Sequence, residues 1–167
     1  MNEKSPECPV LIWRELKTFL ESGISVVVGT RDADLVPEIT RAWGLLVSKD
    51  RKSFSLCVPL ATSRKTLDNL VANGQMTVCC SLPTSYKTVQ LKGQCIATTE
   101  PRRPDLTAVE RHRQAFGRLN TRIGFPRQRT ETFWQREVET SPALVKLRFV
   151  PEQVFDQTPG PDAGSRL

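Results

Sequence analysis

Apolar residues along the chain recur at two spacings, one typical of helices and one typical of strands. Residues 9–22 carry five apolar side chains at helical spacing, and Gly23 follows where such a helix would end. The same reasoning predicts a short helix over residues 63–73, a longer one over 104–119 and a further helical piece over 130–139. These segments alternate irregularly with the predicted strands, which argues against a doubly wound parallel fold.

Runs of β-branched and apolar residues predict six strands, the last of them interrupted at Pro151. Strands in meander order, with one short helix inserted and others packed around them, indicate an antiparallel barrel-like sheet. The Pro- and Gly-rich tail, residues 158–167, is expected to be extended. The predicted strands cover residues 24–30, 35–48, 53–59, 75–82, 85–100 and 143–157.

Length and charge limit the function classes. The 167 residues suit one domain, and no apolar run of about 18 residues is present, so no membrane span is predicted. The N-terminus does not read as a signal peptide, and we expect a cytoplasmic protein. The net charge is +6, and residues 102–136 hold nine arginines and no lysine. That segment is either a solvated helical face or a nucleic-acid-binding surface.

The cysteines and the one histidine suggest neither a disulfide framework nor a metal site. Five cysteines are present, none in a CxxC pair, and we expect reduced, buried thiols. Cys79 and Cys80 are adjacent in a predicted strand and should point to opposite faces. His112 lies among arginines on a predicted helix, where a surface position is expected.

The stretch ATSRKTLDNLVANG, residues 61–74, places three phosphate-binding residue types at a predicted helix start. Thr62 or Ser63 is a good N-cap. The first N–H groups of a helix lack partners and carry partial positive charge, so Ser63, Arg64 and Lys65 could hold a phosphate between them. The alternative is an ordinary cap followed by two solvated cations, and residue types alone leave both open.

Strand parity adds Arg41 and Trp43 to the candidates. In a regular strand over residues 35–48, alternate residues from Ile39 to Val47 share one face, and Arg41 is the sole charge on it. A buried arginine needs a carboxylate, a bound phosphate or a bulge that exposes it. Trp43 beside it could flank a planar ring or belong to the core.

Gln90 belongs to a polar row in the strand predicted over residues 85–100. Val89, Leu91 and Cys95 mark one face of that strand. The opposite face suits the polar edge of a cofactor, solvent or another subunit, and periodicity cannot separate these. That face carries Tyr86, Thr88, Gln90, Lys92 and Gln94.

The order of a strand, a Ser-Arg-Lys helix start, a strand and a glutamine in TVQLKG resembles the flavin-binding split barrels of the pyridoxamine 5′-phosphate oxidase superfamily. In that family the trio holds the FMN phosphate and the glutamine lies beside the flavin. Ser63, Arg64 and Lys65 match the trio, Gln90 matches the glutamine, and Arg41 lies near the family's strand-two arginine, displaced by one residue. The match covers residues 23–97.

The resemblance implies a mainly β (α+β) fold, an antiparallel Greek-key split β-barrel with flanking helices, forming one domain over residues 1–167. It also implies a homodimer with FMN at the interface. The family's oxidases carry a C-terminal Arg-x-His segment that contacts the pyridoxal substrate, and this chain has no counterpart. We therefore expect an FMN-dependent oxidoreductase related to the oxidase, acting on an unidentified small substrate, with no catalytic residue assigned.

Two alternatives remain at this stage. Related split barrels bind deazaflavin or haem, and haem would need His112 or a cysteine as its axial ligand. The other alternative is a non-enzymatic, basic nucleic-acid-binding module that uses the arginine-rich residues 102–136. FMN binding is the leading hypothesis, with Ser63, Arg64, Lys65, Arg41, Trp43 and Gln90 as the candidate cofactor-binding residues.

Overall fold

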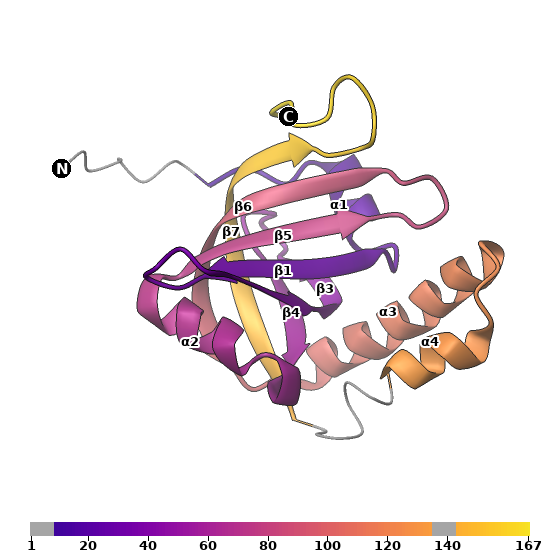
Figure 1. The fold of residues 1–167 in the computed structure, drawn as a ribbon, viewed down its shortest axis with the longest axis horizontal. Helices are drawn as coiled ribbons and strands as arrows, with labels where there is room; N and C mark the ends of the chain where they lie inside the picture. The colour runs from indigo at the N-terminus through magenta and orange to yellow at the C-terminus, as the bar shows by residue number, and fades with distance from the viewer. Residues whose placement is uncertain (1–8, 135–142) are drawn as a thin grey trace.

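The computed structural model describes residues 9–134 and 143–167, and a seven-stranded antiparallel sheet forms its centre. The strand order is β2-β1-β5-β6-β7-β4-β3, and the sheet curls into a half-barrel (Figure 1). The predicted mainly β, antiparallel split-barrel architecture is confirmed. The strands are β1 Ser25–Arg31, β2 Pro37–Arg41, β3 Trp43–Val47, β4 Phe54–Pro59, β5 Gln75–Ser81, β6 Thr88–Thr99 and β7 Leu144–Asp156.

Helices lie around the rim of the sheet, and each predicted helix is present with changed bounds. In Figure 1, α2 lies at one end of the sheet, while α3 and α4 form a hairpin at the other. The predicted helix over 130–139 begins earlier, and its residues 135–139 lie outside the described residues. The helices are α1 Arg14–Leu20, the 3-10 turn η1 Leu60–Thr62, α2 Arg64–Asn73, α3 Arg103–Arg122 and α4 Arg127–Trp134.

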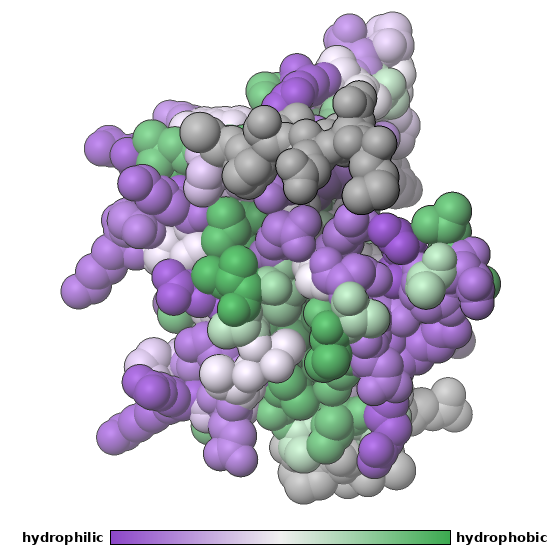
Figure 2. Space-filling view, turned by 90° about the vertical axis from the view of Figure 1, so that its left-hand side faces the viewer, coloured by the Kyte–Doolittle hydropathy of each residue, from purple (hydrophilic) through white to green (hydrophobic). Residues whose placement is uncertain are grey.

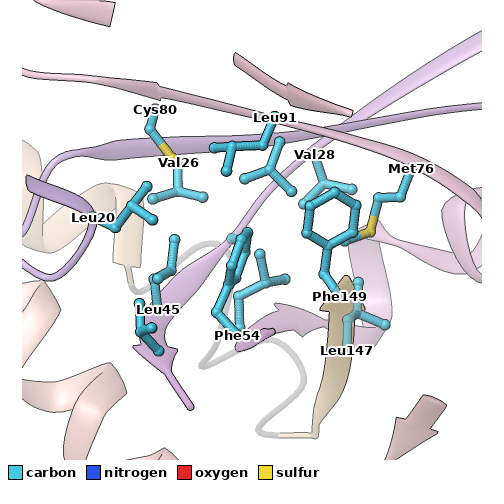
Figure 3. Packing of buried hydrophobic residues seen from close by; sticks show 14 of the residues in the cluster. Leu20, Val26, Val28, Leu45, Phe54, Met76, Cys80, Leu91, Leu147 and Phe149 are labelled. Carbon is cyan, nitrogen blue, oxygen red and sulfur yellow. The ribbon is translucent and has the colours of Figure 1, made fainter. Parts of the chain in front are cut away.

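The core fills the inside of the curled sheet. Inward-facing residues of β1, β5 and β6 meet those of β4 and β7, as Figure 3 shows for Val26, Leu91 and Phe149. Phe54 and Phe149 pack with ring centroids 5.0 Å apart. Burying these side chains contributes about 1.5–3 kcal/mol each, so the inward face fixes the register of the sheet and leaves the outer face for function.

The single strand predicted over residues 35–48 is wrong, because the chain divides at Ala42 into β2 and β3. These two strands lie at opposite ends of the strand order. Gly44 adopts a positive φ of 68°, and the pairing of β3 with β4 shifts register between Trp43 and Leu46. The alternation that put Arg41 and Trp43 on one face therefore fails between them.

The C-terminal strand also differs from the prediction. β7 continues through Pro151 instead of stopping there, with a register shift where Lys92 and Gly93 of β6 face it. A side chain on Gly93 would clash with the Val150 carbonyl, so glycine allows this close approach. The tail is not extended, since it folds back and the Leu167 N–H donates to the Val154 carbonyl at 2.9 Å.

Candidate functional site

The N-terminus of α2 is open to an anion. Ser63 occupies the N-cap position, and the first intrahelical bond runs from the Leu67 N–H to the Ser63 carbonyl at 2.9 Å. The Ser63 side chain does not cap the helix, and its Oγ lies 2.9 Å from Thr40 Oγ1 on β2. The N–H groups of residues 64–66 therefore keep their free positive potential.

The two cations of the trio differ in their surroundings. Arg64 is exposed, whereas Lys65 Nζ lies 3.1 Å from Asp32 Oδ2 in the turn between β1 and β2. Asp32 also accepts hydrogen bonds from the Val36 and Asp34 N–H groups. The bond from Val36 and then the bond from Lys65 lower the pKa of Asp32. An anion arriving at α2 therefore competes with this carboxylate for Lys65.

Buried polar contacts fix α2 against β1 and β2. Asn69 Nδ2 donates to Thr30 Oγ1 at 3.1 Å. This contact lies further along α2 than the contact between Ser63 and Thr40. Thr66 is fully buried between them, and its Oγ1 has no hydrogen-bond partner among the described residues. The sequence reasoning missed this polar layer, although threonines at inward-facing positions of β1 and β2 were a readable signal.

Arg41 lies on the outer face of β2, opposite in direction to Thr40. Its Nη1 donates to Ser25 Oγ at 3.2 Å, and its guanidinium carbon lies 5.7 Å from the centre of the Phe116 ring on α3. Arg41 is half-buried rather than enclosed in the core. Arg41 follows Thr40, the residue in contact with Ser63, but its guanidinium is directed to Ser25 and Phe116.

One cross-strand row joins Arg41 to Gln90. Arg41 pairs with Val27 on β1, Val27 pairs with Cys79 on β5, and Cys79 pairs with Gln90 on β6. Paired residues point to the same face of a sheet, and strands about 4.8 Å apart place the two ends of this row about 14 Å from each other. The small side chains between them leave room for a flat ring.

An open groove of about 850 Å³ lies beside this row on the outer face, along the neighbouring row from Ile39 to Lys92, and Gln90 is the residue of the first row that lines it. Gln90 lies in its wall, and the Gln157 side chain donates to Gln90 Oε1 at 3.2 Å. As predicted, Gln90 and Lys92 face outward while Val89 and Leu91 are buried. The groove lining includes Gly29, Ile39, Thr77, Gln90, Lys92 and Gln153.

Apolar side chains are exposed beside the groove. Figure 2 views the side of the molecule that carries α2 and the turn between β1 and β2, and apolar surface is spread there among polar side chains. The fractional exposure is 69% for Leu35, 68% for Ile39 and 84% for Val71. Of these three residues, Ile39 also lines the groove.

Trp43 and His112 are both in the interior. Trp43 is 1% exposed and packs with His112 and Phe116. Of the two alternatives for this residue, a ring beside the cofactor or a core residue, the structure shows the core residue. The expected surface position of His112 is wrong. Its Nδ1 accepts the Gly44 N–H at 2.9 Å, so its Nε2 carries the proton and donates to the Ile24 carbonyl at 2.7 Å. With both ring nitrogens engaged, it offers no axial ligand to haem.

The cysteines of the described residues are free thiols. Cys57 and Cys80 are buried, all four described cysteines are free, and burial raises the pKa of Cys57 to about 12. Cys8 lies outside the described residues. Among described side chains no group of acidic, His or Cys residues could hold a metal ion. No helix among them is long and apolar enough to cross a membrane.

The arginine-rich segment forms α3 and α4 rather than a loop. Arg113 pairs with Glu110 at 2.7 Å, so the helix neutralises part of its own charge. Hydrogen bonds from Arg113 also lower the pKa of Glu110. Nucleic-acid binding by this segment stays a prediction.

Comparison with known proteins identifies the fold. No protein-family model and no curated protein matches the chain by sequence. Among solved structures, HupZ of Group A Streptococcus superposes with a TM-score of 0.53 at 18% identity, covering 92% of this chain and 99% of that one. An FMN-binding protein from Syntrophomonas wolfei subsp. wolfei gives a TM-score of 0.53 at 14% identity, covering 84% and 82%. A general stress protein 26-related protein of the pyridoxinephosphate oxidase family, from Clostridium acetobutylicum, gives 0.50 at 17% identity, covering 85% and 84%.

Proposed function

We propose that this chain, which has the split-barrel fold of the pyridoxamine 5′-phosphate oxidase superfamily, is a homodimeric FMN-binding oxidoreductase acting on a small substrate. The observation that carries the proposal is the uncapped N-terminus of α2, flanked by Arg64 and Lys65. It adjoins β2 at the point where the row from Arg41 to Gln90 begins. The proposal places the phosphate at the start of α2 and the ring along this row.

The residues fit FMN by the chemistry of their donors. The N–H groups of residues 64–66, with the side chains of Arg64 and Lys65, would hold the phosphate. Arg41 would add charge from the strand edge. The isoalloxazine ring would lie over Val27 and Cys79, with the Gln90 amide at its polar edge. Bound FMN would supply the hydride chemistry, and the chain would orient it and exclude water.

A second copy of the chain is proposed to close the groove. The outer face of the sheet is open, and Ile39, exposed at the edge of the groove, would be removed from water by such a partner. A flat ring lying on one sheet would otherwise leave one face in solvent. Each subunit of the proposed dimer would therefore complete the site of the other.

Reconstitution tests the binding step. The purified chain is titrated with FMN, riboflavin, a deazaflavin and haem, and binding is followed by flavin fluorescence and by absorption. We expect FMN to bind more tightly than riboflavin, because only FMN carries the phosphate. If the deazaflavin or haem binds more tightly than FMN, that compound is the cofactor and FMN is not. If none of the four compounds binds, the proposed cofactor site is wrong. Sedimentation velocity decides whether the flavin-loaded species is a dimer.

Turnover is a separate measurement. The bound flavin is reduced anaerobically, and its reoxidation by candidate small-molecule acceptors is followed in a stopped-flow instrument. An oxidoreductase accelerates reoxidation by its own substrate over the rate for free reduced FMN. Equal rates for every acceptor tried, despite tight binding, would support a flavin carrier instead of an enzyme.

A further inference from the structure

Helix α3 is pressed unusually close to the sheet beside Arg41. Gly23 and Gly44 both adopt positive φ, at 80° and 68°. A Cβ on Gly44 would lie 2.6 Å from Val109 Cγ2, and one on Gly23 would clash with Ala115. Because both glycines lack a side chain, the backbones of α3 and of the sheet approach to a distance that no other residue type allows.

His112 locks the helix in this position. Its Nδ1 accepts the N–H of Gly44 at the start of β3, and its Nε2 donates to the carbonyl of Ile24, which precedes β1. The imidazole is 7% exposed and packs against Trp43 with ring centroids 5.5 Å apart. Two directional bonds to different strands fix both the rotation and the height of α3 at this point.

Phe116 follows His112 by four residues and therefore lies on the same face of α3. Its ring meets Trp43 edge-on, with centroids 5.7 Å apart and an interplanar angle of 83°. The Arg41 guanidinium lies over the same ring, 5.7 Å from its centroid, while Ser25 accepts one of its N–H groups at 3.2 Å. A cation over an aromatic face is attracted to it, and that contact limits the directions the guanidinium can take.

We infer that Phe116, held in place by His112, is a positioning residue for Arg41 and holds its guanidinium on the outer face at the end of the row toward Gln90, where it meets an anionic group of the ligand. The inference rests on the proposed function for the identity of that ligand. The positioning itself is a property of the free chain. An arginine that is already oriented loses less conformational freedom when it binds an anion, so the ligand binds more tightly.

The test compares Phe116→Leu with Phe125→Leu, which makes the same change at an exposed ring in the turn between α3 and α4. The first readout is the nitrogen-detected NMR resonance of the Arg41 guanidinium Nε–H in the ligand-free protein. In the wild type we expect the Phe116 ring current to displace this resonance, because the guanidinium lies 5.7 Å from the ring centroid. We expect Phe116→Leu to return it to the position of a solvated arginine, and Phe125→Leu to leave it unchanged.

A conservative variant and a binding measurement complete the design. Phe116→Tyr keeps the ring and should retain the displaced Arg41 resonance even if its unfolding temperature changes. We expect Phe116→Leu to weaken FMN binding roughly three- to tenfold, whereas Phe125→Leu binds as the wild type does. An Arg41 resonance that is the same in wild type and Phe116→Leu would overturn the inference. Failure of the wild type to bind FMN would instead overturn the proposed function, because the Arg41 resonance is measured without a ligand.

Discussion

The hydroxyl oxygens of Ser63 and Thr40 lie 2.9 Å apart, and this contact joins the N-cap of α2 to the edge strand β2. It has two consequences. The Ser63 hydroxyl is directed to β2 and does not cap its own helix, so the first N–H groups of α2 stay available. The next residue after Thr40 is Arg41, whose side chain turns to the outer face, where the row toward Gln90 begins. One buried contact thus places the proposed phosphate end next to the proposed ring platform.

The first prediction concerns the two cations at α2. The double variant Arg64→Gln/Lys65→Gln should weaken FMN binding about 10- to 100-fold, because charge-assisted hydrogen bonds to the phosphate are lost. Riboflavin has no phosphate, so its affinity should change little. Fluorescence titration of both ligands measures the difference.

The control for this prediction removes the same charge elsewhere. Lys49 and Lys52 lie in the exposed turn between β3 and β4. The variant Lys49→Gln/Lys52→Gln should leave FMN affinity near the wild-type value. If the α2 variant lost riboflavin and FMN to the same degree, the phosphate would not be bound at this helix.

The second prediction concerns Asp32, which forms an ion pair with Lys65 in the ligand-free protein. Asp32→Asn keeps an oxygen for the Val36 N–H and removes the competing charge, so FMN affinity should rise about two- to fivefold. Asp34→Asn removes the same charge from the same turn without touching Lys65 and serves as the control. Calorimetric titrations at low and high salt measure both. A drop in affinity for Asp32→Asn would mean that Asp32 supports Lys65 instead of competing for it.

Local patterns predicted the elements of the site better than their relation to each other. Alternation along β6 correctly placed Gln90 outward, and the helix start at Ser63 was readable from its residue types. The row from Arg41 to Gln90 depends on the registers of three strand pairs, which no local pattern contains. The break at Ala42 was hidden because neither a proline nor a polar turn sequence stands beside it.

The interior position of His112 could not be predicted from its own neighbourhood. Arginines surround it in the sequence, but the helix face that carries it docks against Gly44 and the residue after Gly23, both far away along the chain. In the sequence Gly23 marks a predicted helix end, and Gly44 lies inside the strand predicted over residues 35–48. Their role in admitting α3 becomes visible only when the helix is seen against them.

The third prediction concerns the ring platform. Cys79→Tyr would fill the space between Arg41 and Gln90 with a bulky side chain on the outer face. We expect binding of both FMN and riboflavin to fall at least about tenfold, because the clash is with the ring they share. Thr98→Tyr, at an exposed position near the end of β6, is the control. Unchanged riboflavin affinity in Cys79→Tyr would mean that the flavin ring does not bind over this row.

The fourth prediction is the pH dependence of stability set by His112. Burial lowers the pKa of His112 from 6.5 to about 4, and the nearby charge of Arg41 adds to this effect. The hydrogen bond to the Ile24 carbonyl raises the pKa but does not outweigh them. Above pH 6.5 neither the folded nor the unfolded chain binds this proton. Between 6.5 and about 4 only the unfolded chain binds it, so the free energy of unfolding falls as the pH falls. The loss from this one group should reach about 3 kcal/mol and stop below that window.

Urea unfolding of wild type and His112→Gln at a series of pH values tests this directly. The variant should be less stable at neutral pH, because its side chain cannot reproduce both imidazole bonds, yet its stability should fall less steeply through the window. Asp105 does not obscure the comparison. Burial raises the pKa of Asp105, but the hydrogen bond from Lys146 opposes it and the pKa lies below 3.8. The contribution of Asp105 to stability is therefore lost at lower pH than the contribution of His112. Equal pH slopes for the two proteins would mean that His112 takes up its proton while the chain remains folded.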